Sequence, residues 1–170
     1  DTAHKYDLSI EAWINPYRVS QRNDFSLLAK NNIALKWQNT SKLIVLDNGI
    51  YFNPCYNEVT DLIVKGVKEI LLNYNVDSFC FDDYFYPTTD ASFDAAAFAE
   101  SGASDRSIWR KEQCNLMVQA MYNAVKQANP KVLFGISPQG TLSGNEKQSA
   151  DVQTWGQTAG YCDYLLPQLY

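Results

Sequence analysis

The chain has 170 residues, 46% of them apolar and 19% charged, a composition that favours one globular domain with a hydrophobic core over disorder. The formal charge is -5 without any basic block, and no apolar stretch is long enough to cross a bilayer. We therefore expect neither a nucleic-acid partner nor a membrane-spanning segment. A single histidine and four widely spaced cysteines argue against a zinc site, and we expect no metal and no cofactor.

Alternation and helical periodicity divide the chain into strands and helices. Pro16 ends the first strand because proline cannot donate to a ladder, and Asp47-Asn48-Gly49 is a strong hairpin signal. Asp105 is placed to cap a long helix, which Asn129-Pro130 ends. In chain order, the expected elements are first a helix end at 2–6, a strand at 8–15, a polar irregular loop at 19–41, a hairpin of 43–46 and 50–52, a helix at 57–74, a strand at 76–82 and a short helix at 94–99. A helix at 105–128, a strand at 131–137, a short helix at 149–158 and a strand at 162–170 follow. In the helix at 105–128, the residues expected to be buried are Ile108, Cys114 or Leu116, Met117, Met121 and Val125.

The order strand, helix, strand, helix, strand, helix, strand argues for right-handed βαβ units and a parallel sheet. We therefore predict the α/β class and, more specifically, a (β/α)8 TIM-type barrel. A complete barrel needs roughly 250 residues. Residues 1–170 would then form one domain that holds about half of such a barrel. A smaller open sheet is the alternative.

The strand at 76–82 is the centre of this prediction. Phe79 and Phe81 share one face by the two-residue period, whereas Cys80 and Asp82 share the other. An apolar outer face and a small or polar inner face suit a barrel strand with helices packed outside. Such a strand delivers Asp82 and Asp83 to the carboxyl rim, where these barrels place their chemistry.

The strand ends supply carboxylates, amides, hydroxyls and aromatic rings. Carboxylates act as acids and bases on glycosidic bonds. We expect Asp82, on the inner face, to be the general acid, with Asp83 in support on the opposite side. Structural roles in capping a turn or pairing with Arg18 are the alternative, and Glu11 is expected to be a core salt-bridge partner. The groups that we expect to hold a sugar are Asn15, Tyr17, Arg18, Tyr84, Tyr86, Ser137, Gln168 and Tyr170.

Four segments, in order, resemble the successive strand-end motifs of the glycosyl-hydrolase-like family 10: Glu11 to Arg18, Phe81 to Pro87, Phe134 to Pro138 and Leu166 to Tyr170. These are bacterial barrel proteins, mostly secreted or on the cell surface. The resemblance implies a (β/α)8 barrel, of which residues 1–170 would form a partial glycosidase-like domain, the central half with strands 3 to 6. It also implies glycoside hydrolysis, with peptidoglycan glycan strands as a plausible polysaccharide substrate, and an extracellular or cell-surface location. This location is an expectation from the resemblance alone, since we recognise no export signal in the printed sequence.

Two departures from the family pattern affect this interpretation. The first two and last two strands of the family's barrel are missing, and a second catalytic carboxylate would lie on one of them. Gln139-Gly140-Thr141 stands where the family more often has an aromatic residue. A carbohydrate-binding barrel without catalysis therefore remains an alternative to a glycosidase, and an open-sheet structural domain without a ligand is a third.

Overall fold

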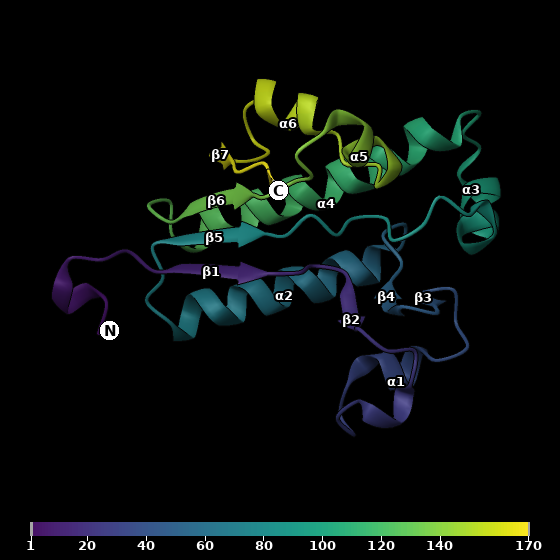
Figure 1. Ribbon diagram of the computed structural model, residues 1–170, viewed down its shortest axis with the longest axis horizontal. Helices are drawn as coiled ribbons and strands as arrows, with labels where there is room; N and C mark the ends of the chain where they lie inside the picture. The colour runs from purple at the N-terminus through teal and green to yellow at the C-terminus, as the bar shows by residue number, and fades with distance from the viewer. Residues whose placement is uncertain (1, 170) are drawn as a thin grey trace.

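A computed structural model of the chain describes residues 2–169. Its main sheet has four parallel strands in the order β1-β5-β6-β7. They are β1 (Glu11–Ile14), β5 (Ser78–Phe81), β6 (Leu133–Ile136) and β7 (Tyr164–Leu165). Figure 1 shows β1, β5 and β6 side by side and pointing the same way. The predicted α/β class and parallel sheet are confirmed.

Two long helices, α2 (Asn57–Asn73) and α4 (Arg106–Ala128), cover one face of this sheet (Figure 1). Phe79 and Phe81 lie in the same buried cluster as the apolar stripe of α2, as expected for the outer face of a barrel strand. The cluster joins residues from both helices and the sheet: Val59, Ile63 and Val67 from α2, Met117, Met121 and Val125 from α4, and Phe134 and Ile136 from β6.

One expectation about α4 is wrong. Ile108 is 59% exposed, whereas Trp109 and Arg110 are buried. Of the alternatives Cys114 and Leu116, Cys114 is buried and Leu116 is exposed. Asp105 caps the helix as predicted, accepting a hydrogen bond from the Ile108 N–H at 3.0 Å. Ile108 stands about 1.7 helical turns before Cys114, so it lies on a different face from the buried row.

A second, antiparallel sheet has the order β2-β4-β3, with β2 (Arg18–Ser20), β3 (Leu43–Leu46) and β4 (Gly49–Phe52). The predicted hairpin is confirmed as β3 and β4. The predicted irregular loop at 19–41 is wrong, because it contains β2, a 3-10 helix (Phe25–Leu27) and α1 (Ile33–Trp37). Polar residues interrupt the apolar period in this stretch, so the sequence did not predict these elements. Ala34 is nevertheless buried in a small separate core with Leu43 and Ile50.

Short elements complete the chain: 3-10 helices His4–Tyr6 and Ala91–Asp94, α3 (Ala95–Ser101), α5 (Leu142–Lys147) and α6 (Val152–Gln157). Among the elements expected from the sequence, none covered residues 142–147, where α5 lies. Thr141 begins α5 by accepting a hydrogen bond from the Gly144 N–H at 3.2 Å. The last predicted strand is much shorter than expected, although Gln139 and Gln168 form a further parallel bridge beyond β7.

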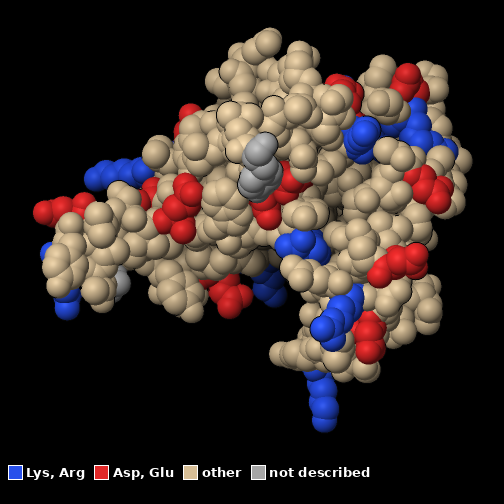
Figure 2. All heavy atoms as spheres, viewed as in Figure 1, with Lys and Arg blue, Asp and Glu red and all other residues tan. Residues whose placement is uncertain are grey.

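Acidic and basic side chains are mixed over the face shown in Figure 2, and both kinds meet near its centre, at the carboxyl ends of the parallel strands. Within residues 2–169, no helix combines the length and the apolar character needed to cross a bilayer.

Candidate active site

Backbone hydrogen bonds of the parallel sheet continue beyond the end of β5, up to the residues of the site. The Asp82 N–H donates to the Ile14 carbonyl at 2.8 Å, and the Ser137 N–H donates to the Phe81 carbonyl at 2.7 Å. These two bonds extend the ladder one step past the strand ends. Because carboxyl ends of parallel strands lie at one edge, residues that follow β1, β5, β6 and β7 converge there.

Two glutamines from neighbouring strand ends hold the two aspartates. Gln168 Nε2 donates to Asp82 Oδ1 at 2.9 Å, and Gln139 Nε2 donates to Asp83 Oδ2. The Asp83 N–H also donates to Asp82 Oδ1 at 3.0 Å. Asp82 therefore accepts two N–H donors through one oxygen, which fixes the orientation of its carboxylate.

Asp83 is the more buried of the two carboxyl groups, with 6% of its surface exposed. Burial, followed by the negative charge and hydrogen bond of Asp82, raises the pKa of Asp83 to about 6. Strand alternation predicted opposite sides of the sheet for the two side chains. Instead both line one cleft, because the chain leaves the extended conformation after Phe81 and bends at Asp83. The two carboxyl groups therefore interact as a pair.

The cleft above this pair has a volume of about 640 Å³. The Arg18 guanidinium lies 4.3 Å from the centre of the Tyr84 ring, so a cation and an aromatic face form one wall. Asn15 holds the backbone of Arg18 in place, since its Oδ1 accepts the Arg18 backbone N–H at 2.9 Å. The cleft is lined by Trp13, Arg18, Gln21, Asp82, Asp83, Tyr84, Gln139 and Gln168.

Three predicted sugar-binding residues lie in the interior instead. Tyr17 is fully buried in the main core, and its side chain is unavailable to a ligand. Ser137 is also buried, and its hydroxyl donates to the Leu166 carbonyl at 2.8 Å, which ties β6 to the segment after β7. Tyr86 is buried as well but borders a neighbouring cavity. Tyr170 lies outside the described residues.

Sequence reasoning did not select Trp13, Gln21 and Gln139 as site residues. Trp13 alternates with Ala12 and Ile14 on β1, so the two-residue period could have predicted that its side chain faces the inside of the sheet. Gln21 could not have been found in this way, because it follows β2, which was not predicted. The expected salt bridge of Glu11 is not seen among the described residues. Its carboxylate accepts hydrogen bonds from the Tyr164 hydroxyl and from Ser78 Oγ, the latter at 3.1 Å.

Among residues 2–169, no group of three or more His, Cys, Asp and Glu side chains is arranged to hold a metal ion. The chemistry that this cleft offers is that of paired carboxyl groups beside a cation, amides and aromatic rings.

Residues 1–170 match the family described as Glycosyl hydrolase-like 10. The chain is 32% identical to glycosyl hydrolase YngK of Bacillus subtilis strain 168, covering all of this chain and 37% of that protein. It is 29% identical to glycosyl hydrolase DigH of Escherichia coli K12, covering all of this chain and 44% of the relative. The chain thus spans less than half the length of these curated relatives.

Solved structures of glycosidases share the fold. The alpha-galactosidase of Lactobacillus brevis matches 97% of this chain and 20% of its own, with a TM-score of 0.59 at 17% identity. Alpha-L-fucosidase isoenzyme 2 of Paenibacillus thiaminolyticus matches 86% of this chain and 23% of its own, with a TM-score of 0.58 at 13% identity. Both are (β/α)8-barrel glycoside hydrolases. At these low sequence identities, the structural likeness is evidence for the fold alone.

Proposed function

Because the chain belongs to the glycosyl hydrolase-like 10 family, we propose that the intact protein hydrolyses O-glycosidic bonds of a polysaccharide at the Asp82–Asp83 cleft. One observation carries this proposal: two neighbouring carboxyl groups, one of them buried, lie at the carboxyl edge of the parallel sheet beneath an open cleft. Glycoside hydrolysis requires a carboxylic acid that keeps its proton until the leaving oxygen needs it.

We assign the proton to Asp83 rather than to Asp82, the general acid expected from strand alternation. Burial and the Asp82 charge keep Asp83 protonated to higher pH, with a pKa of about 6. Asp82 accepts the N–H groups of Gln168 and Asp83, and its charge stabilises the positive character that develops on the sugar ring. Arg18, Tyr84 and Gln168 would contact the sugar, with Asn15 positioning Arg18.

We further propose that residues 1–170 supply strands 3 to 6 of the barrel, and that a second catalytic carboxylate comes from another strand of the intact protein. Peptidoglycan glycan strands are the proposed polysaccharide, and the protein would act outside the cell or at its surface, where that polymer lies. The aromatic walls Trp13 and Tyr84 support a sugar ligand, since amphipathic rings stack on sugar faces.

Asparagine substitutions test the assignment in the intact protein. Asp83→Asn removes the transferable proton while keeping size and a hydrogen-bond acceptor for Gln139. We expect turnover of peptidoglycan strands to fall at least ~100-fold, the usual scale for losing a general acid. Asp82→Asn should lower turnover by a similar order. Asp61→Asn, an exposed carboxylate on α2, is the matched control and should keep wild-type turnover. Wild-type turnover by Asp83→Asn would refute the proton assignment.

A carbohydrate-binding protein without catalysis is the second candidate. The observation that favours it is that Gln139 already occupies an oxygen of Asp83, the group that would have to reach the glycosidic oxygen. Calorimetry of glycan oligomers beside a reducing-sugar assay separates the two candidates. Binding without release of reducing ends would favour the second.

A further inference from the structure

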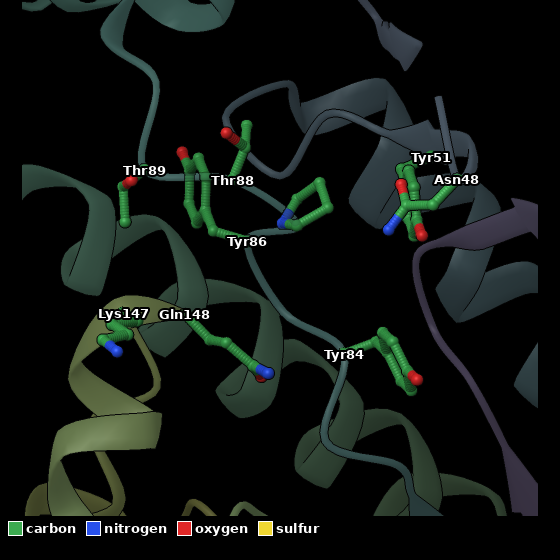
Figure 3. A pocket seen from close by; sticks show the side chains of 9 residues that line it. Asn48, Tyr51, Tyr84, Tyr86, Thr88, Thr89, Lys147 and Gln148 are labelled. Carbon is green, nitrogen blue, oxygen red and sulfur yellow. The ribbon is translucent and has the colours of Figure 1, made fainter. Parts of the chain in front are cut away.

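A second cavity, of about 330 Å³, lies beside the active-site cleft and is not used by the proposed hydrolysis. Three segments far apart in the sequence form it: the turn and strand of the β3–β4 hairpin, the loop after β5, and the end of α5 (Figure 3). The cavity is of the size that small ligands occupy. Its walls are formed by Asn48, Tyr51, Tyr84, Tyr86, Pro87, Thr88, Thr89, Lys147 and Gln148.

Tyr84 joins this cavity to the active-site cleft, because its side chain lines both. Arg18 stacks on the Tyr84 ring and pairs in register with Tyr51 across β2 and β4. Tyr51 and Tyr84 line the same cavity, and Arg18 contacts the ring of Tyr84 from the strand that pairs with Tyr51, so the three residues lie at the boundary of the two spaces. A chain-like ligand that crosses Tyr84 would therefore contact both spaces.

Two of the residues that line the cavity each have a polar atom that is buried without a partner. Among the described residues, the Tyr86 hydroxyl and Gln148 Oε1 are inaccessible to solvent and make no hydrogen bond. Figure 3 shows the Gln148 carboxamide reaching from α5 toward Tyr84. A buried oxygen without a donor is costly, so a small rearrangement of the carboxamide that lets a ligand hydroxyl reach this oxygen would be favourable. Sugar hydroxyls are such donors, and tyrosine rings offer the flat faces on which sugars stack.

The walls are held in place before any ligand binds. The Tyr86 N–H donates to the Gln148 carbonyl at 3.0 Å, which ties the loop after β5 to the end of α5. The buried Arg110 donates to the Thr88 carbonyl at 3.4 Å and to the Asp90 carbonyl at 2.8 Å, and its guanidinium lies 4.9 Å from the centre of the Tyr86 ring. A preformed cavity loses less ordering entropy on binding.

The charge of this cavity differs from that of the cleft. Lys147 is the one charged residue among the nine that line it, whereas two carboxyl groups and Arg18 line the cleft. The cavity therefore has no carboxylate to repel an acidic substituent of a sugar, and it has no pair of acids for hydrolysis.

From these observations we propose that the cavity is a second sugar-binding subsite, which holds a unit of the same glycan beyond the one bound at Asp83. The subsite proposal rests on the proposed function, which supplies the identity of the glycan. The β2-β4-β3 sheet, which the parallel barrel does not require, would then serve to extend the binding surface along the substrate.

Gln148→Leu in the intact protein tests the subsite, because leucine keeps the bulk, removes the carboxamide and leaves the backbone bond to Tyr86. The probes are peptidoglycan glycan oligomers of increasing length. For oligomers long enough to cross Tyr84, we expect kcat/KM to fall about tenfold relative to that for the disaccharide, the loss of about one good hydrogen bond. Gln127→Leu, an exposed glutamine near the far end of α4, is the matched control and should leave the length dependence unchanged.

The outcomes separate the subsite from the hydrolysis. Cleavage with a length dependence that Gln148→Leu does not alter would overturn the subsite and keep the hydrolase. Calorimetry of Asp82→Asn and of the double variant Asp82→Asn/Gln148→Leu measures oligomer binding without turnover. Weaker binding of long oligomers by the double variant supports the subsite even if the wild type cleaves nothing. Equal affinities of the two proteins for long oligomers, or no binding of any oligomer by either protein, would overturn it.

Discussion

Gln168 donates a hydrogen bond to Asp82 at 2.9 Å across 86 residues of chain. The same Nε2 also donates to the Ser137 carbonyl at 3.1 Å, so one amide connects the ends of β5 and β6 to the segment after β7. Gln139 makes the corresponding contact with Asp83. The site is thus a product of the parallel strand order, with each carboxyl group oriented by an amide from another strand.

Removing the Gln168 amide should weaken this orientation. In Gln168→Leu, Asp82 loses a donor to its carboxylate and the Ser137 carbonyl loses one too. A hydrogen bond to a charged group contributes about 1.5–3 kcal/mol, so we expect turnover to fall roughly tenfold or more. Steady-state kinetics of the intact protein measure this. Gln157→Leu, exposed at the end of α6, is the control, and equal turnover by both variants would show that Gln168 does not orient Asp82.

The raised pKa of Asp83 makes stability depend on pH. Its pKa rises from the ordinary 3.8 to about 6 on folding, which corresponds to roughly 3 kcal/mol. A raised acid pKa stabilises the fold below about pH 4, and this contribution is lost as pH rises through about 6. We therefore expect urea unfolding to show less stability from this group at pH 7 than at pH 4.

Asp83→Asn cannot ionise, so it should remove this part of the pH dependence and be relatively more stable at pH 7. A carboxyl-carbon NMR titration of the wild type should place the Asp83 transition near pH 6. In Asp82→Asn the transition should move lower but stay above the ordinary value, because burial is the larger cause. A wild-type transition near pH 4 would contradict this account.

The regular elements were predictable from sequence because their periodicity is strong. The α2 stripe and the Phe79–Phe81 face are read directly from spacing, and the Asp47-Asn48-Gly49 turn fixes the hairpin. The small elements around α1 and α5 were missed. They depend on local caps such as Asn32 and Thr141, and on one or two buried contacts that leave no repeat in the sequence.

For the site, the sequence predicted which strand ends converge but not which way each side chain points. Asp82, Asp83, Arg18, Tyr84 and Gln168 meet at one cleft, as the βαβ order requires. Tyr17 is buried because the chain turns into β2 after Pro16, which directs its ring into the core. Such directions depend on irregular backbone after the strand ends, where the two-residue period stops.

Gly135 lies directly beneath the Tyr164 ring on the inner face of the sheet. A Cβ added at Gly135 would come within 2.1 Å of a ring carbon of Tyr164. We expect Gly135→Ala to destabilise the protein by about 1–3 kcal/mol through overpacking. Urea unfolding measures this, and Tyr164→Ala should make the glycine substitution nearly neutral. Tyr164→Phe, which keeps the ring but loses the hydroxyl that binds Glu11, should give no such rescue. Equal costs in all three backgrounds would show that the ring does not constrain Gly135.

Asp94 should be among the most sensitive carboxylates of the fold. Its side chain is fully buried and accepts Arg106 Nη1 at 2.6 Å and Arg110 Nε at 2.5 Å. Removing one partner of a buried ion pair leaves an uncompensated charge, so Asp94→Ala should destabilise by about 3–5 kcal/mol, measured by urea unfolding. Glu146→Ala breaks the exposed pair with Lys111 and should cost less than about 1 kcal/mol. Comparable losses in the two variants would mean that burial of the Asp94 cluster contributes little, and that the loop carrying Thr88 is held by other contacts.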